Sequence, residues 1–188
     1  DHEKFFADLR HCLLPYQDMD RYARNPLENA SFLVSSRHPR PDYHGRGFLP
    51  RTSGTTAEVL EMLLVMAFGK APFRLEENAL VLAFDPILPA WMFTQEASNC
   101  EFLQPDGTSR CEPVPANAFA ALFLSRTLVV YRNPERKPTY GADPATVTGY
   151  EAVLSDGTVV SSEGPALPPD LAHAVRERRI PRLDITLA

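Results

Sequence analysis

The sequence is poor in glycine and cysteine, has no excess of positive charge, and contains no long apolar run. It has 9 glycines and 3 cysteines but 18 prolines among 188 residues. Little glycine with much proline argues against flexible linkers and suits strands joined by ordered turns. No apolar segment reaches the roughly 20 residues that a membrane-spanning helix needs, so we expect no membrane contact.

The charge balance excludes one class of partner. The 24 acidic residues outnumber the 19 lysines and arginines, and the formal net charge is -5. A nucleic-acid surface requires a basic stripe, so we expect no nucleic-acid partner. The arginine cluster near the end of the chain is short and suits a solvated helix face; it consists of Arg176, Arg178, Arg179 and Arg182.

The three cysteines match no zinc-binding spacing, and we predict no metal site. Cys100 and Cys111 flank the turn-like Pro105-Asp106-Gly107. They either face each other across a hairpin or stay free thiols in a reducing compartment, which is the simpler interpretation and fits a cytoplasmic protein. The chain begins at Asp1 without a methionine or a signal sequence, so we expect it to be a piece of a longer protein.

Patterning divides the chain near residue 70 into two parts, residues 1–70 and 71–188. In the first part, Glu3 to Leu14 has the apolar spacing of an amphipathic helix. Residues 16–51 have no regular pattern, and such a long irregular stretch is usually functional. It contains an apolar run at residues 30–36, which we expect to be buried.

The second part has the short apolar runs and turn residues of a β-rich domain, typical of a β-sandwich. Ser125-Arg126 and Ser155-Asp156-Gly157 each predict a hairpin turn. Leu171 to Arg178 predicts a short helix. Strands are expected at residues 79–84, from 91, at 118–124, 127–132, 147–154, 158–161 and 183–187.

The most informative segment is Arg51-Thr52-Ser53-Gly54-Thr55-Thr56-Ala57-Glu58, which opens a strongly apolar helix ending near Gly69. Thr55 and Glu58 have the spacing of a capping box. An apolar helix of this kind is expected to be buried. Its start either only caps the helix or also offers free backbone N–H groups to an anion such as phosphate.

Two other segments contain candidate ligands. Glu28 and Asn29 precede the apolar run and either bind a ligand or satisfy backbone donors in a loop. Between residues 37 and 46, three arginines, two histidines and an aspartate form either a pocket for an anion or a sugar, or a solvated loop. The two histidines have no third ligand at metal-site spacing. His11 lies on an expected helix and needs no functional role.

Three segments together resemble a known family. They are Pro26-Leu27-Glu28-Asn29-Ala30-Ser31-Phe32-Leu33-Val34-Ser35-Ser36, His44-Gly45-Arg46-Gly47-Phe48, and residues 51–58. They resemble the C-terminal part of the cellobiose phosphorylase family, inverting glycoside phosphorylases of the glycoside hydrolase family 94 type, related to the C-terminal regions of cyclic β-1,2-glucan synthases. The resemblance extends to the order of the later strands and covers most of the chain.

The resemblance implies a mixed α and β fold. Residues 1–70 would be the last helices and active-site loops of an (α/α)₆ barrel, and residues 71–188 a β-sandwich-like C-terminal domain. Phosphate would replace water as the nucleophile on a β-linked gluco-oligosaccharide or glucan. Inorganic phosphate is thus a co-substrate, and no cofactor is implied. The general acid, an aspartate, would lie upstream of this chain.

The resemblance also implies site residues. The family's phosphate-binding Thr/Ser-Gly pair falls on Ser53 and Gly54, with Thr55 beside it. The residues that would line the sugar site are Glu28, Asn29, His44 and Arg46.

Two positions depart from the family's pattern. Leu27 stands where the best-known members have a lysine, and Ser35 where they have a phosphate-binding histidine. Charge-assisted bonds to phosphate are the strong ones, so these departures favour weaker phosphate binding. A hydrolase on the same scaffold is therefore an alternative to a phosphorylase.

A further alternative is a non-catalytic module that binds glycans or packs on a catalytic chain. Four aromatic side chains would then stack on sugar rings, or else belong to the core: Trp91, Phe93, Tyr131 and Tyr140. An apolar helix without its barrel neighbours would leave an exposed hydrophobic surface that tends to bind other proteins. We therefore expect association with the upstream catalytic portion, with a partner chain, or with a second copy as a homodimer.

Overall fold

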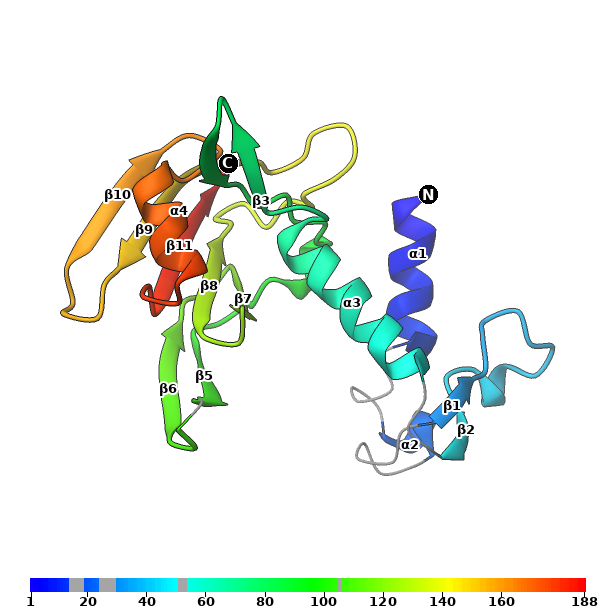
Figure 1. The fold of residues 1–188 in the computed structure, drawn as a ribbon. Coiled ribbons are helices and arrows are strands. Elements are labelled where there is room, and N and C mark those ends of the chain that lie inside the picture. Colours follow the sequence, from blue (N-terminus) through cyan, green and yellow to red (C-terminus); the bar gives the residue numbers. More distant parts are fainter. Residues whose placement is uncertain (14–18, 24–29, 51–53, 105) are drawn as a thin grey trace. The chain divides into compact units, whose positions relative to one another are not determined.

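The computed structural model describes residues 1–13, 19–23, 30–50, 54–104 and 106–188 (Figure 1). The fold is mixed α and β, with many strands and few helices. Two compact units, Asp1–Leu63 and Leu64–Ala188, meet within one helix, and each is described by itself. Among the described helices, none combines the length and apolar character needed to cross a bilayer.

The first unit begins with the expected amphipathic helix. Helix α1 (His2–Asp8) is followed directly by a π-helical turn, η1 (Leu9–Leu13). The Asp1 carboxylate caps the helix by accepting a hydrogen bond from the backbone N–H of Lys4 at 3.1 Å. Of the predicted apolar face, Phe6 and Leu9 are buried as expected, whereas Phe5 is 37% exposed.

The stretch expected to be irregular contains regular elements. Helix α2 (Met19–Tyr22) is followed by the antiparallel strands β1 (Ala30–Leu33) and β2 (Gly47–Pro50). The prediction that the run 30–36 is buried is wrong for Phe32, whose side chain is 59% exposed. Phe32 pairs with the exposed Phe48 in a two-stranded ribbon, and such a ribbon does not bury both of its faces.

Helix α3 (Gly54–Phe68) matches the helix predicted from the sequence. It begins at Gly54, so Thr55 lies inside the first turn and not at the capping position that we expected. Gly69 ends the helix with φ +83°, and its N–H donates to the carbonyl of Val65 at 2.8 Å.

The expectation that α3 is buried holds for one end only. Met66, Ala67 and Phe68 are buried, whereas Leu60 and Leu64 are 57% and 53% exposed. These two leucines are one turn apart and therefore share a face. An apolar composition does not by itself decide burial, because burial requires a partner surface for each face of the helix.

The second unit is built on a five-stranded sheet with the order β10-β9-β11-β8-β7. The central strand β11 runs parallel to β8 and antiparallel to β9, and the other pairs are antiparallel. The predicted hairpins β7–β8 and β9–β10 are confirmed. The strands are β7 (Ala118–Phe123), β8 (Thr127–Arg132), β9 (Val147–Val153), β10 (Val159–Glu163) and β11 (Arg182–Leu187).

Two strand pairs and one helix complete this unit. The pairs are β3 (Phe73–Glu76) with β4 (Ala79–Leu82), and β5 (Ser98–Leu103) with β6 (Ser109–Val114). Helix α4 (Pro169–Arg176) confirms the predicted short helix and leads into β11.

The strand expected from Trp91 is wrong. The segment is a 3₁₀ turn, η4 (Ala90–Met92), in which the N–H of Met92 donates to the carbonyl of Pro89 at 3.0 Å. Proline has no N–H for a strand ladder, and Pro89 begins a turn at this place.

Both faces of the sheet are covered near β8. On one face, a large core packs Tyr131 and Leu183 against the end of α3, strand β4 and helix α4. On the other face, the β5–β6 hairpin packs over β7 and β8, with Val114 and Phe102 against Leu128 and Val130. Strand β8 is therefore buried on both sides, as its continuous apolar run requires.

The cysteines of the β5–β6 hairpin are free thiols. Cys100 pairs with Glu112 and Cys111 pairs with Glu101, so the two positions are one residue out of register. Neighbouring residues of a strand point to opposite faces, which separates the two sulfur atoms. The free-thiol alternative is thus confirmed.

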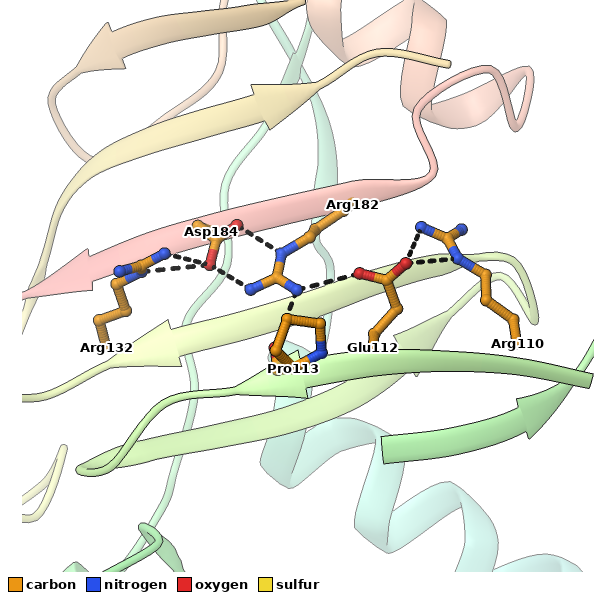
Figure 2. Close-up of polar contacts among 6 residues, drawn as sticks. All are labelled: Arg110, Glu112, Pro113, Arg132, Arg182 and Asp184. Carbon is orange, nitrogen blue, oxygen red and sulfur yellow. Dashed lines mark hydrogen bonds and ion pairs between the residues drawn. The ribbon is translucent and has the colours of Figure 1, made fainter. Parts of the chain in front are cut away.

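An ionic network joins the β5–β6 hairpin to the sheet (Figure 2). The side chains alternate in charge in the order Arg132, Asp184, Arg182, Glu112 and Arg110. Arg182, which we assigned to a solvated helix face, is instead on β11 with its side chain only 11% exposed. Its partner Asp184 is only two residues away, but the β5–β6 hairpin that contributes Glu112 to the network is about 70 residues away in the sequence, so the sequence does not show that Arg182 is buried.

Candidate functional site

The loop between β1 and β2 is the candidate site, because it holds two of the predicted site residues, His44 and Arg46. Backbone hydrogen bonds close its base. The N–H of Gly45 donates to the carbonyl of Val34 at 2.8 Å, and the N–H of Val34 donates to the carbonyl of Arg46 at 3.1 Å. A 3₁₀ turn, η3 (Pro41–Tyr43), forms its tip. Residues 35–45 are therefore held as a closed, ordered loop.

The ring of Tyr43 organises the cationic side of this loop. The guanidinium carbon of Arg40 lies 4.1 Å from the ring centroid, and that of Arg46 lies 5.3 Å from it. Both distances are within the range of cation–π attraction. The His38 ring stacks on Tyr43 with centroids 5.6 Å apart. The Tyr43 ring thus contacts two guanidinium groups and one imidazole ring.

Arg40 is further held by Asp42, with its Nη2 atom 2.7 Å from the carboxylate. The hydrogen bond from Arg40 lowers the pKa of Asp42 and raises that of Arg40, so both stay charged near neutral pH. Arg46 has no such carboxylate partner among the described residues. The guanidinium of Arg46 is therefore the better placed of the two to bind an anion or a sugar hydroxyl.

A chain of hydrogen bonds orients His44. Its Nε2 atom lies 2.7 Å from the carbonyl of His38, and its Nδ1 atom lies 3.2 Å from Nε2 of His11. Nη1 of Arg21 lies 2.7 Å from Nδ1 of His11. One set of tautomers satisfies all three contacts: Arg21 donates to His11, His11 donates to His44, and His44 donates to the carbonyl of His38. Both imidazoles are then neutral, and all four of their nitrogen atoms are used.

The structure thus distributes the predicted site residues unevenly. His44 and Arg46 lie together in the loop, and Gly54 and Thr55 are the first two residues of α3. Glu28, Asn29 and Ser53 lie outside the described residues. Because both nitrogens of His44 are used within the protein, His44 orients the loop, whereas Arg46 offers a charged group.

Sequence reasoning missed His11 and Arg21. His11 was assigned no functional role because it lies on a helix, yet its ring contacts that of His44 with centroids 5.4 Å apart. Within the loop, only Gly45 indicates that His11 and Arg21 lie close by, because its missing side chain leaves room for them. A Cβ atom there would lie 3.0 Å from Cδ of Arg21 and 3.3 Å from the carbonyl oxygen of His11.

Replacing Gly45 with alanine should therefore disturb the chain of hydrogen bonds. Gly45 has φ +80°, so a side chain adds a strain of about 1–2 kcal/mol and also displaces Arg21. We expect altered ring ¹⁵N shifts of His11 and His44 in NMR spectra. Gly157→Ala is the matched control, because Gly157 has φ +85° with no atom near its added Cβ. Unchanged histidine shifts in Gly45→Ala would contradict the assigned hydrogen-bond directions.

Other chemistry is not supported in the described part of the chain. No group of three or more His, Cys, Asp or Glu side chains there has an arrangement that suits a metal ion. Phe93 and Tyr131, two of the four aromatics that would either stack on sugars or belong to the core, are buried in the core, so the core alternative holds for them.

No protein-family model matches this sequence, and no curated protein matches it.

Proposed function

We propose that the chain is the C-terminal portion of a carbohydrate-active enzyme that cleaves or forms β-glucosidic bonds, acting as an inverting glycoside phosphorylase. The observation that carries the proposal is the β1–β2 loop, where the guanidinium of Arg46 lies over the Tyr43 ring and the ring of His44 is oriented by the carbonyl of His38. These residues belong to a segment that resembles the cellobiose phosphorylase family. A guanidinium held in place suits a sugar hydroxyl or a phosphate oxygen.

Helix α3 would supply the phosphate site. Gly54 and Thr55 are the first residues of the helix, where free N–H groups and the helix dipole favour an anion. Ser53, the third residue of the proposed phosphate site, precedes them in the sequence. Glu28, Asn29, His44 and Arg46 would line the sugar site. Arg46 would compensate in part for the cationic group missing at Leu27, and the general acid would come from upstream.

The first unit would be the last helices of an (α/α)₆ barrel, and the second unit a β-sandwich-like domain behind it. Exposed apolar side chains support this proposal. Phe32, Phe48 and Leu60 are exposed, and a complete barrel would cover such side chains. The upstream catalytic portion would be the natural partner, and a homodimer the alternative. A cytoplasmic location is part of the same proposal.

The proposal is tested on the full-length parent protein with β-linked gluco-oligosaccharides, with and without inorganic phosphate, by following the release of sugar 1-phosphate. Phosphate-dependent release is the expected result. Release of free sugar without phosphate would instead establish a hydrolase on the same scaffold. No cleavage under either condition would overturn the enzymatic proposal.

Ser53→Ala tests the phosphate assignment in the same assay. A hydrogen bond to a charged group contributes about 1.5–3 kcal/mol, so the phosphate KM should rise about 10- to 100-fold. Ser161→Ala, on the exposed strand β10, is the matched control and should leave it unchanged. If Gly54→Val and Ser53→Ala both leave phosphate dependence unaltered, the anion site lies elsewhere.

A glycan-binding module without catalysis is the second candidate. Trp91 and Tyr140 remain half-buried and accessible, unlike Phe93 and Tyr131. Trp91 is the one tryptophan of the chain, so its fluorescence reports on this surface directly. Quenching by a β-glucan would support the module, and unchanged fluorescence with every β-glucan tested would count against it.

A further inference from the structure

A second polar site lies in the β-sheet unit, where the β5–β6 hairpin crosses the sheet. A pocket of about 360 Å³ opens there, which is near the lower end of the range for small-ligand sites. Ser98 and Asn99 of β5 and Pro113 and Val114 of β6 line it together with Arg132 of β8 and Arg182 of β11.

The two arginines differ in how much of their hydrogen-bonding capacity is used. Arg182 is 11% exposed and donates from Nε and Nη2 to Asp184, and from Nη1 to Glu112 and to the carbonyl of Pro113. Arg132 is 47% exposed and donates to Asp184 from Nε and Nη2 only. No described residue accepts a hydrogen bond from its Nη1 atom. Arg132 therefore keeps donors for a ligand, and Arg182 does not.

The charge of the network also favours an anion. Three guanidinium groups alternate with two carboxylates, and an arginine stands at each end (Figure 2). One positive charge is thus not neutralised within the network. None of the residues that line the pocket is acidic. The carboxylate of Asp184 is 5% exposed and lies behind the guanidinium groups that it pairs with.

The geometry of Arg132 indicates which anion is recognised. Asp184 occupies the Nε side of the guanidinium, which leaves the end-on pair of N–H groups on Nη1 and Nη2. This pair matches two oxygens of one carboxylate or phosphate group. The adjacent β5 residues Ser98 and Asn99 contribute polar atoms to the lining, and Pro113 and Val114 contribute apolar atoms.

From these observations, we propose that this pocket binds a small organic anion, through one carboxylate or phosphate group held by Arg132. The site is independent of the proposed phosphorylase chemistry, because all of its residues belong to the β-sheet unit. Asp184 and Arg182 are positioning residues that hold the Arg132 guanidinium in place.

The test uses the full chain and three probes followed by NMR: glucuronate as a carboxylate, glucose 6-phosphate as a phosphate, and glucose as the uncharged control. At about 0.3 kcal/mol for each of about 13 heavy atoms, glucuronate should bind with a roughly millimolar Kd. We expect shifts at the backbone amides of Ser98 and Asn99, which line the pocket, with an anion and none with glucose. Binding of one anion alone identifies which group the site accepts.

Arg132→Gln should weaken the binding by about tenfold or more, since it removes a charge-assisted pair of hydrogen bonds. It leaves the paired Arg182 and Asp184 in place. Ser98→Tyr is a second variant, which fills the pocket without touching the network. Arg126→Gln, on the β7–β8 turn, is the matched control and should bind as the wild type does. No shift with either anion, equal shifts with glucose, or unaltered binding by Arg132→Gln would overturn the proposal.

Discussion

Replacing Asp184 with alanine is expected to lower the free energy of unfolding of the β-sheet unit by about 3–5 kcal/mol. The carboxylate accepts hydrogen bonds from Nε and Nη2 of Arg182 at 2.7 and 3.0 Å, and from Nε and Nη2 of Arg132 at 3.1 and 2.9 Å. Its removal leaves the nearly buried guanidinium of Arg182 without its main partner. Such an uncompensated charge costs more than the original pair contributed.

Chemical unfolding of the variant, followed by far-UV circular dichroism, measures this loss. Asp143→Ala is the matched control, because Asp143 forms an exposed ion pair with Lys137 at 3.0 Å. Exposed pairs contribute about 1 kcal/mol or less. A loss in Asp184→Ala no larger than that in Asp143→Ala would show that the network does not stabilise the fold.

The same carboxylate makes the stability depend on pH. Burial alone would raise the pKa of Asp184, but the hydrogen bond and charge of Arg182, with those of Arg132, outweigh it and lower the pKa below the ordinary 3.8. The stabilisation is therefore complete above pH 3.8 and is lost as the pH falls through the lower folded-state pKa. We expect the acid-induced loss of stability to be smaller in Asp184→Asn than in the wild type.

Replacing Tyr131 with alanine is the second change with a large expected effect, about 3–5 kcal/mol. Tyr131 on β8 is completely buried, and its ring packs against those of Phe84 and Phe119. Its hydroxyl donates to the carbonyl of Ala67 at 2.6 Å and so ties the end of α3 to β8. Burial raises the pKa of this hydroxyl well above its ordinary value, so it remains a donor.

Tyr131→Phe separates the hydroxyl from the ring. It should cost about 1–3 kcal/mol, because the carbonyl of Ala67 loses a buried hydrogen bond while the packing is retained. Leu103→Ala is the control for an exposed apolar side chain and should change stability by less than about 0.5 kcal/mol. Equal stability of Tyr131→Phe and the wild type would show that the bond to Ala67 contributes nothing to the fold.

Part of the candidate site could be predicted from the sequence. The polar cluster at residues 37–46 was recognised by composition, and the loop places His44 and Arg46 within it as expected. What could not be predicted is that Tyr43 gathers the guanidinium groups of Arg40 and Arg46, or that His11 uses one nitrogen of His44. His11 and His44 are 33 residues apart, and the residues around each of them do not indicate that the two rings are in contact.

The local elements of this protein follow from short stretches of its sequence. The residues of the turns predicted the β7–β8 and β9–β10 hairpins. Gly69, in the left-handed backbone conformation, predicted the end of α3. These features depend on the backbone preferences of a few consecutive residues, which the sequence displays directly.

The tertiary structure alone decided where β11 lies and what Arg182 and Asp184 do. Alternation predicted a strand at residues 183–187, but not its place between β8 and β9. That place brings Asp184 to Arg132, which is 52 residues away, and Arg182 to Glu112. A buried charged side chain is stable only when oppositely charged or hydrogen-bonding groups lie next to it. Here strand pairing brings those groups together, and strand pairing depends on segments from the whole chain.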